Sequence, residues 1–229
     1  MTSERVSWAE FQSRFRWQQG EHLTGIAPTG AGKTTLFLNL MPYRKYSIML
    51  GTKPDDKLYR EIIRKQGFRR VESIREVKPW MNRILLWPRQ RDTIDETMLA
   101  QQRAFREALD VIVKHGGWTV WVDECKYISE MLRLRTQLTY CLEQLRSINA
   151  TVICGAQRPA WLPLSVLSSS SHAFLWKSVY RDDAKRLADI GGVDAKAITE
   201  ELKTLGKHEF LYVHTRGTDA RVLRSQVGR

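Results

Sequence analysis

Short apolar runs alternate with longer amphipathic stretches along this chain. Six runs have the length and β-branched content of buried strands, namely 23–27, 46–50, 118–122, 151–156, 172–177 and 209–214, the last strand expected. The stretches between them have the apolar spacing of helices, at 35–41, 56–66, 94–115, 129–147, 182–190 and 195–205. A further run, 83–87, is expected as an edge strand, and 163–171 as a serine-rich loop. This alternation predicts an α/β fold with a mainly parallel sheet and helices on both faces.

The two ends of the chain differ from this pattern. Residues 7–10 have the form of a capping box, and Trp8, Phe11 and Phe15 follow at helical spacing. We expect residues 1–19 to form an aromatic helix that packs on its own domain or docks on a neighbouring subunit. Residues 20–215 are expected to form one domain. Residues 216–229, which hold four arginines, are expected to form a flexible basic tail.

The chain is strongly basic. Of its 229 residues, 37 are Lys or Arg and 25 are Asp or Glu, which gives a formal charge of +12. Such an excess favours a polyanionic partner, nucleic acid before an acidic membrane, over a merely basic enzyme. Residues 60–91 carry ten basic and three acidic side chains, with Phe68, Trp80 and Trp87 among them. This segment fits a DNA backbone contact, or equally a solvated helix and an edge strand.

The cysteines and apolar segments indicate the compartment. Cys125, Cys141 and Cys154 are odd in number and have no CxxC spacing, which is typical of reduced thiols rather than disulfides or a zinc site. The sequence shows no signal peptide and no apolar run of the roughly 20 residues that span a bilayer. We therefore expect a soluble cytoplasmic protein with no membrane partner.

The most informative motif is Ala27-Pro28-Thr29-Gly30-Ala31-Gly32-Lys33-Thr34, which fits a phosphate-binding loop with Ala27 in place of the first glycine. An apolar strand precedes it and a helix follows, as the chemistry requires. Backbone N–H groups of the loop would cradle the β-phosphate of ATP, and Lys33 would reach the β- and γ-phosphates. The expected nucleotide-binding residues are Thr29, Gly30, Ala31, Gly32, Lys33, Thr34 and Thr35.

Two later strands end in residues suited to hydrolysis. Asp123 and Glu124 follow the run 118–122, at the edge where an open α/β sheet binds its ligand. Asp123, with the Thr34 hydroxyl, is expected to hold Mg²⁺, and Glu124 to deprotonate the attacking water. Gln157 follows the run 151–156 and is expected at the mouth of the same site, where its amide can contact both the γ-phosphate and the water.

Together with Ala156-Gln157-Arg158-Pro159, these motifs resemble the FtsK–HerA superfamily of ring-forming, DNA-pumping ATPases over roughly residues 20–215. The downstream cluster at 181–183, followed by a helix and Gly191-Gly192, is similar to another segment of that family. The resemblance implies a RecA-like P-loop NTPase sandwich, Gln157 as the γ-phosphate sensor, and translocation of double-stranded DNA by a pentameric or hexameric homomeric ring. A bare motor domain of this size most resembles viral and phage genome-packaging ATPases, whose partners would include a capsid or portal component.

An arginine at the end of a helix also matches the family. Arg146 precedes the strand 151–156, and Gln157 follows it, so about 20 Å of strand separates Arg146 from its own nucleotide. Arg146 is therefore expected to act on the neighbouring subunit's ATP, with Arg158 as the rival finger and a helix-end cap as the plain alternative.

Two other functions fit the same motifs. A small-molecule phosphotransferase of the nucleotide-kinase type could use 60–91 as an arginine-rich lid, although Glu124 and Gln157 suit water better than a small acceptor. A nucleotide-switched assembly protein would bind a partner and pump nothing.

Overall fold

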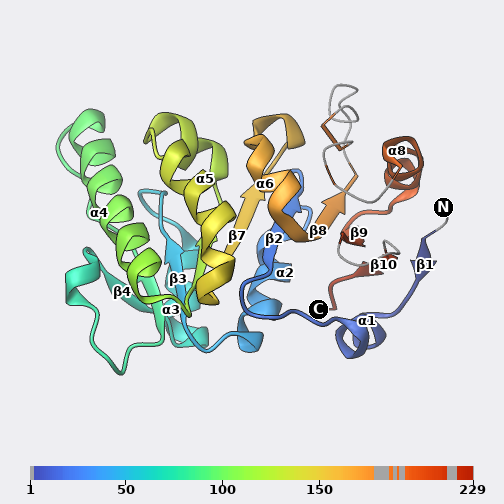
Figure 1. The fold of residues 1–229 in the computed structure, drawn as a ribbon, viewed down its shortest axis with the longest axis horizontal. Helices are drawn as coiled ribbons and strands as arrows, with labels where there is room; N and C mark the ends of the chain where they lie inside the picture. Colours follow the sequence, from blue (N-terminus) through green and yellow to red (C-terminus); the bar gives the residue numbers. More distant parts are fainter. Residues whose placement is uncertain (1–2, 178–185, 188–189, 191–193, 216–220, 229) are drawn as a thin grey trace.

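The computed structural model in Figure 1 describes residues 3–177, 186–187, 190, 194–215 and 221–228. Ten strands of this part form one sheet in the order β1-β10-β9-β8-β2-β7-β6-β3-β5-β4. They are β1 (Glu4–Arg5), β2 (His22–Ile26), β3 (Ser47–Leu50), β4 (Arg69–Val71), β5 (Arg83–Leu86), β6 (Thr119–Val122), β7 (Thr151–Ala156), β8 (Ser170–Trp176), β9 (Glu209–His214) and β10 (Arg221–Gln226).

The strand directions confirm the expected α/β fold. All neighbours from β8 through β2, β7, β6, β3 and β5 to β4 run parallel. Only β9 runs antiparallel to its neighbours, β8 on one side and β10 on the other, and β1 pairs parallel to β10. The carboxyl ends of seven parallel strands therefore meet at one edge of the sheet.

Helices cover both faces of the sheet, as predicted (Figure 1). One apolar core lies beneath α4 (Ile94–His115), α5 (Arg135–Gln144), α6 (Leu164–Ser169) and α8 (Ala195–Thr204). A second core lies beneath α1 (Trp8–Arg14), α2 (Lys33–Leu40) and α3 (Lys57–Gln66). No helix in the described ranges is long and apolar enough to cross a membrane.

Local capping signals explain where several helices begin and end. The Thr93 hydroxyl accepts a hydrogen bond from the Glu96 N–H, and the Glu96 carboxylate accepts one from the Thr93 N–H, so the predicted capping box starts α4. Asp56 caps α3 through the Leu58 N–H, and Gly67 ends that helix at φ 71°. Ser7 caps α1 by accepting from the Glu10 N–H.

The N-terminal helix packs on its own sheet, which was one of its two expected roles. Phe11 is fully buried and its ring lies 5.3 Å from the rings of both Phe210 and Tyr212, and 6.0 Å from that of Phe174. These contacts join α1 to β8 and β9. The aromatic spacing of residues 8–15 therefore serves the core of this chain.

Four expectations about elements are wrong. The strand 83–87 is not at the edge of the sheet, because β4 pairs with the outer side of β5. The sequence pattern did not predict β4, because two of its three residues are exposed arginines. The helix expected at 129–147 is interrupted: a π-helical turn at Tyr127–Met131 precedes Arg133, whose φ of 53° ends it, and a 3₁₀ turn at Leu145–Ile148 follows α5. The loop expected at 163–171 contains α6, because Val166 and Leu167 bury against the core.

The fourth correction concerns the C-terminus. Glu209–His214 is not the last strand, because residues 221–226 of the expected flexible tail form β10 with Val222 and Leu223 buried. Arg224 is tied to Glu209 by an ion pair, so this arginine belongs to the fold. Most of the helix expected at 182–190, the 181–183 cluster, Gly191-Gly192 and Arg216 lie outside the described residues.

Candidate nucleotide-binding site

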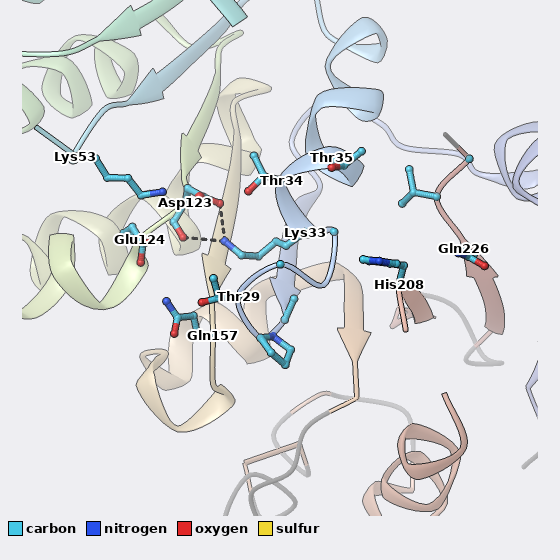
Figure 2. A pocket seen from close by; sticks show the side chains of 16 residues that line it. Thr29, Lys33, Thr34, Thr35, Lys53, Asp123, Glu124, Gln157, His208 and Gln226 are labelled. Atoms are coloured by element: carbon cyan, nitrogen blue, oxygen red, sulfur yellow. Dashed lines mark hydrogen bonds and ion pairs between the residues drawn. The ribbon is translucent and has the colours of Figure 1, made fainter. Parts of the chain in front are cut away.

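A cavity of about 380 Å³ opens at the carboxyl ends of the parallel strands (Figure 2). Its position follows from the strand order, in which β7 lies between β2 and β6. The loop after β2, Gln157 after β7, and Asp123 with Glu124 after β6 therefore converge there. The lining residues are Ala27, Pro28, Thr29, Gly30, Gly32, Lys33, Thr34, Thr35, Lys53, Asp123, Glu124, Gln157, His208, Gln226, Val227 and Gly228.

The loop after β2 has the backbone geometry of a phosphate cradle. Gly30 has φ 77° and Gly32 has φ 110°, values that side-chain-bearing residues rarely adopt. Gly32 is the N-cap of α2, so no side-chain oxygen covers the first N–H groups of that helix. These N–H groups and the positive end of the helix can bind an anion. Of the seven predicted nucleotide-binding residues, only Ala31 does not line the cavity.

Lys33 and Asp123 form a buried ion pair at the centre of the cavity. The Lys33 Nζ lies 2.6 Å from Asp123 Oδ1 and 3.2 Å from the Asp123 carbonyl oxygen. Their side chains are only 10% and 8% exposed. The ion pair joins the phosphate-binding loop to the Asp123–Glu124 motif.

Two glycines lie beside the Lys33 side chain, and the one at 155 makes room for its ammonium group. Gly25 of β2 and Gly155 of β7 are paired in register. A Cβ on Gly25 would lie 3.5 Å from Lys33 Cγ, and one on Gly155 would lie 2.7 Å from Lys33 Nζ. The side chain of Lys33 therefore crosses a shallow trough in the sheet to reach Asp123.

Glu124 is the predicted general base. It is half-buried beside Asp123 and lines the cavity. Burial raises the pKa of the Glu124 carboxyl and the Asp123 charge raises it further, against the opposing effect of Lys33 and Lys53. A carboxylate with a raised pKa accepts a proton more readily at neutral pH. Gln157 lines the same cavity, as predicted.

Sequence reasoning did not find the remaining lining residues. Lys53 follows the buried strand β3. Because that strand ends at the same edge of the sheet, its position in the sequence could have predicted that Lys53 lies at the site. His208 and the segment 226–228 come from the antiparallel end of the sheet and carry no recognisable motif. His208 lies at φ 68°, and its Nδ1 is 3.3 Å from the Ala31 carbonyl oxygen of the phosphate loop.

The two candidate arginine fingers do not line this cavity. Arg146 lies in the 3₁₀ turn before β7, at the other end of that strand from Gln157. Its backbone packs against Gly20, where an added Cβ would lie 3.1 Å from the Arg146 carbonyl oxygen. Arg158 follows Gln157, with its guanidinium 5.9 Å from the ring centre of Trp161. The roles of both arginines stay predictions.

Within the basic segment 60–91, two arginine–tryptophan pairs lie at β4, the edge strand of the sheet. The Arg69 guanidinium lies 4.7 Å from the ring centre of Trp80, and that of Arg70 lies 4.4 Å from the ring centre of Trp87. Trp80 is 64% exposed. We call Arg69, Arg70 and Trp80 the edge patch, and Trp87 lies buried beneath Arg70.

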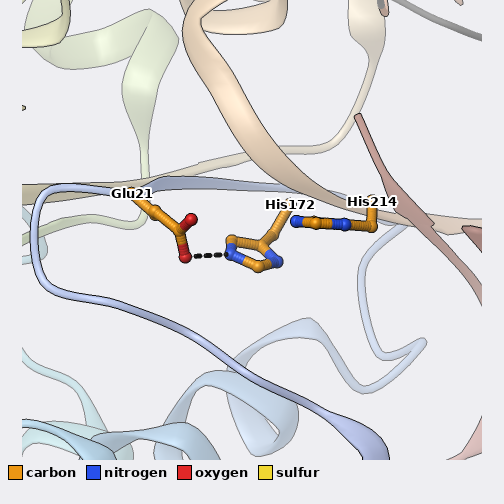
Figure 3. Close-up of side chains that lie close together, drawn as sticks. All are labelled: Glu21, His172 and His214. Carbon is orange, nitrogen blue, oxygen red and sulfur yellow. Dashed lines mark hydrogen bonds and ion pairs between the residues drawn. The ribbon is translucent and has the colours of Figure 1, made fainter. Parts of the chain in front are cut away.

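Figure 3 shows a polar cluster of Glu21, His172 and His214. Glu21 precedes β2 and His172 lies near the start of β8, so the cluster is at the opposite end of these strands from the cavity. Glu21, His172 and His214 each offer a possible metal-ligand atom within 4.8 Å of the others. His172 Nε2 lies 3.0 Å from Glu21 Oε2, however, and His172 Nδ1 lies 2.8 Å from the Tyr212 hydroxyl. Burial lowers the pKa of His172, and Glu21 opposes this while His214 and Arg44 reinforce it. Because both ring nitrogens of His172 have partners, the cluster is a buried hydrogen-bond network.

Comparison with known proteins identifies the fold. No family model and no curated protein matches the amino-acid sequence. Among solved structures, the genome packaging NTPase B204 from Sulfolobus turreted icosahedral virus 2, in complex with AMPPCP, has a TM-score of 0.62 at 12% identity, over 89% of this chain and 96% of its own. VirB4 of Thermoanaerobacter pseudethanolicus has a TM-score of 0.67 at 12% identity, over 91% and 89%. The monomer form of the pCW3 conjugation coupling protein TcpA with ATPγS has a TM-score of 0.56 at 14% identity, over 90% and 60%.

The likeness to B204 and VirB4 confirms two predictions: the RecA-like P-loop sandwich, and the resemblance to the FtsK–HerA superfamily at the level of the fold. At such low identity, chemistry and partners do not follow from the likeness. This chain has the fold of the P-loop ATPases of the FtsK–HerA superfamily.

Proposed function

We propose that this protein is an ATP-hydrolysing motor that moves double-stranded DNA, working as a homomeric ring that packages a viral genome. The observation that carries the proposal is the meeting of the phosphate loop, the Asp123–Glu124 pair and Gln157 at the ends of three adjacent strands. B204, described as a genome packaging NTPase, has the same fold and binds AMPPCP.

The residues present fit MgATP. Thr34 and Asp123 offer the oxygen ligands that Mg²⁺ prefers, and both line the cavity. When bound, Mg²⁺ would neutralise phosphate charge. Lys33 would exchange its Asp123 partner for a phosphate oxygen, which frees the Asp123 carboxylate for the metal.

The same side chains suit attack by water. Glu124 would take the proton of the attacking water, which its raised pKa favours. Gln157 would hydrogen-bond both that water and the γ-phosphate. A carboxylate and an amide at the γ-phosphate position favour hydrolysis over transfer to a small acceptor.

The edge patch is the proposed DNA contact. Guanidinium groups that stack on indole rings keep their N–H donors free to bind phosphates, and backbone contacts of this kind need no base sequence. The overall charge of +12 would attract duplex DNA before the contact forms. A capsid or portal component and the cytoplasm of a host cell are the partner and compartment that this function implies.

ATP turnover with and without long duplex DNA tests the function. We expect turnover to rise when the duplex is added. Turnover that needs a small phosphate acceptor would instead identify a phosphotransferase. A slow rate that duplex DNA does not change would identify a nucleotide-switched assembly protein.

A double substitution tests the DNA surface. Arg69→Ala with Arg70→Ala should weaken binding equally for all sequences and lower the slope of log K against log salt by about 2. The matched control replaces Lys196 and Lys203, which lie on α8 at the other end of the sheet (Figure 1). An unchanged slope in the first variant would place the DNA contact elsewhere, for example at Arg221 and Arg224.

A further inference from the structure

Lys53 lines the nucleotide cavity but belongs neither to the phosphate-binding loop nor to the Asp123–Glu124 motif. It follows β3, which pairs with β6, so it lies at the same sheet edge as Asp123 and Glu124. Figure 2 shows its ammonium group directed toward these two carboxylates. The side chain is 42% exposed, which leaves it accessible to a ligand.

Buried side chains fix the backbone that carries Lys53. The Thr52 N–H donates to the Tyr59 hydroxyl at 3.1 Å, and Gln101 Nε2 donates to the Thr52 carbonyl oxygen at 3.0 Å. Trp87 Nε1 donates to the Lys53 carbonyl oxygen at 2.8 Å. Tyr59 is 2% exposed and Gln101 is 3% exposed. A loop held at three backbone groups of two consecutive residues presents its side chain at a defined position, as a binding site requires.

The Lys53 ammonium already has an anionic partner that a phosphate can replace. Its Nζ lies 2.8 Å from Asp56 Oδ2, while Asp56 Oδ1 caps α3 by accepting from the Leu58 N–H. Partial burial lowers the pKa of Lys53, but the hydrogen bond to Asp56 and the charges of Asp56, Tyr59 and Asp123 together outweigh it, so the pKa is raised and the group stays charged. The N-cap bond of α3 does not depend on Lys53, so Asp56 keeps a partner after the exchange.

Trp87 connects this loop to the edge patch. Its indole N–H binds the Lys53 carbonyl oxygen, and its ring carries the Arg70 guanidinium at 4.4 Å. The ring also packs edge-on against Tyr59, with 5.0 Å between the ring centres. One buried side chain therefore touches both the loop at the nucleotide cavity and a cation of the proposed DNA surface.

We propose that Lys53 is an additional ligand of the γ-phosphate, and that its exchange from Asp56 to the γ-phosphate is transmitted through Trp87 to the edge patch. ATP and ADP then differ in a contact that reaches Arg70, so the affinity for duplex DNA depends on which nucleotide is bound. This inference rests on the proposed function, and it assigns the step that couples the two sites. In one state the Lys53 ammonium binds Asp56, and in the other it binds the γ-phosphate.

Nucleotide affinity tests the first half without DNA. Lys53→Ala should weaken binding of a non-hydrolysable ATP analogue by about tenfold to a hundredfold, the range for a charged hydrogen bond, and leave ADP affinity unchanged. Lys57→Ala is the matched control, because Lys57 is exposed on α3 and does not line the cavity. Equal discrimination between the analogue and ADP in the parent and in Lys53→Ala overturns the assignment.

Duplex affinity in the two nucleotide states tests the second half. A labelled 30-base-pair duplex should bind the parent with dissociation constants that differ about fivefold or more between the ATP analogue and ADP. Lys53→Ala and Trp87→Phe should bring this ratio to about one, because the first removes the ammonium group and the second keeps a ring beside Arg70 but loses the N–H donor with the five-membered ring. Lys57→Ala should keep the ratio. Thermal unfolding of Trp87→Phe confirms that the variant is folded.

The outcomes separate this inference from the proposed function. A parent that binds duplex with a nucleotide-dependent ratio, retained in both variants, overturns the coupling and leaves the DNA function standing. A parent whose ratio is one also overturns the coupling. A parent that binds no duplex in either state overturns the proposed function and the coupling together, while the nucleotide measurement still decides whether Lys53 binds the γ-phosphate.

Discussion

A single methyl group in the trough under Lys33 should disable the nucleotide site. In Gly155→Ala the new Cβ would lie 2.7 Å from both the Asp123 carbonyl oxygen and Lys33 Nζ, and 3.0 Å from Asp123 Oδ1. The carbonyl oxygen belongs to the chain just after β6 and cannot swing away as a side chain would. Lys33 must therefore leave its path, and the two central strands must separate slightly.

Two magnitudes follow from this geometry. Overpacking a filled core costs about 1–3 kcal/mol of unfolding free energy. We expect the methyl group also to keep the Lys33 ammonium from its place at the phosphate, and a lost charged hydrogen bond of that kind is worth about 1.5–3 kcal/mol, which is about tenfold to a hundredfold in ATP affinity. The affinity loss is specific to the displaced ammonium and should exceed what the stability loss alone produces.

The assay pairs this variant with Gly25→Ala. Gly25 is the register partner of Gly155, and its added Cβ would clash with Phe37 Cζ at 2.4 Å but lie at an ordinary contact distance of 3.5 Å from Lys33 Cγ. Urea unfolding should show a cost in both variants, whereas fluorescent ATP titration should show the large affinity loss in Gly155→Ala. Parent-like ATP affinity in a folded Gly155→Ala protein would refute the path of Lys33 across the trough.

Three further predictions use other parts of the molecule. Glu124→Gln should keep ATP bound and lose about 10²- to 10⁴-fold in turnover, and near-parent turnover would disprove the base assignment. Because the pKa of Glu124 is raised, the acidic limb of the parent's pH–rate profile should fall at a higher pH than an ordinary glutamate would give. Mixing inactive Arg146→Ala and Lys33→Ala subunits should restore part of the ATPase rate, since some interfaces then hold both intact groups; recovery only when Arg158→Ala replaces the Arg146 variant would make Arg158 the finger. Because the pKa of His172 is lowered in the folded protein, the unfolded chain binds a proton at higher pH, so stability should fall as pH drops from about 6.5 toward the folded pKa. In thermal unfolding, His172→Gln should make stability depend less on pH, and an equally steep dependence would contradict this prediction.

Short-range signals determined much of the fold and most of the site from the sequence alone. The glycines and Lys33 of the phosphate loop act through local backbone geometry, so their pattern is legible in eight consecutive residues. The capping box at Thr93 and the carboxylates after β6 are likewise set within one turn or one strand end. Because parallel strands present their carboxyl ends at one edge, the convergence of Asp123, Glu124 and Gln157 with the loop also followed from the sequence.

Only the tertiary structure decided what depends on distant neighbours. β4 and β10 escaped notice because a strand with exposed arginines becomes a strand through its pairing partner. Gly155 has no local conformational need for glycine, and its role appears once Lys33, 122 residues earlier, is laid across it. The role proposed for Lys53 depends on Trp87, and the contacts of Trp87 with Lys53 and Arg70 are set by the packing of β3, β5 and β4. Pairing across a sheet brings together residues that sequence spacing does not relate, and the coupling proposed for this protein lies in those contacts.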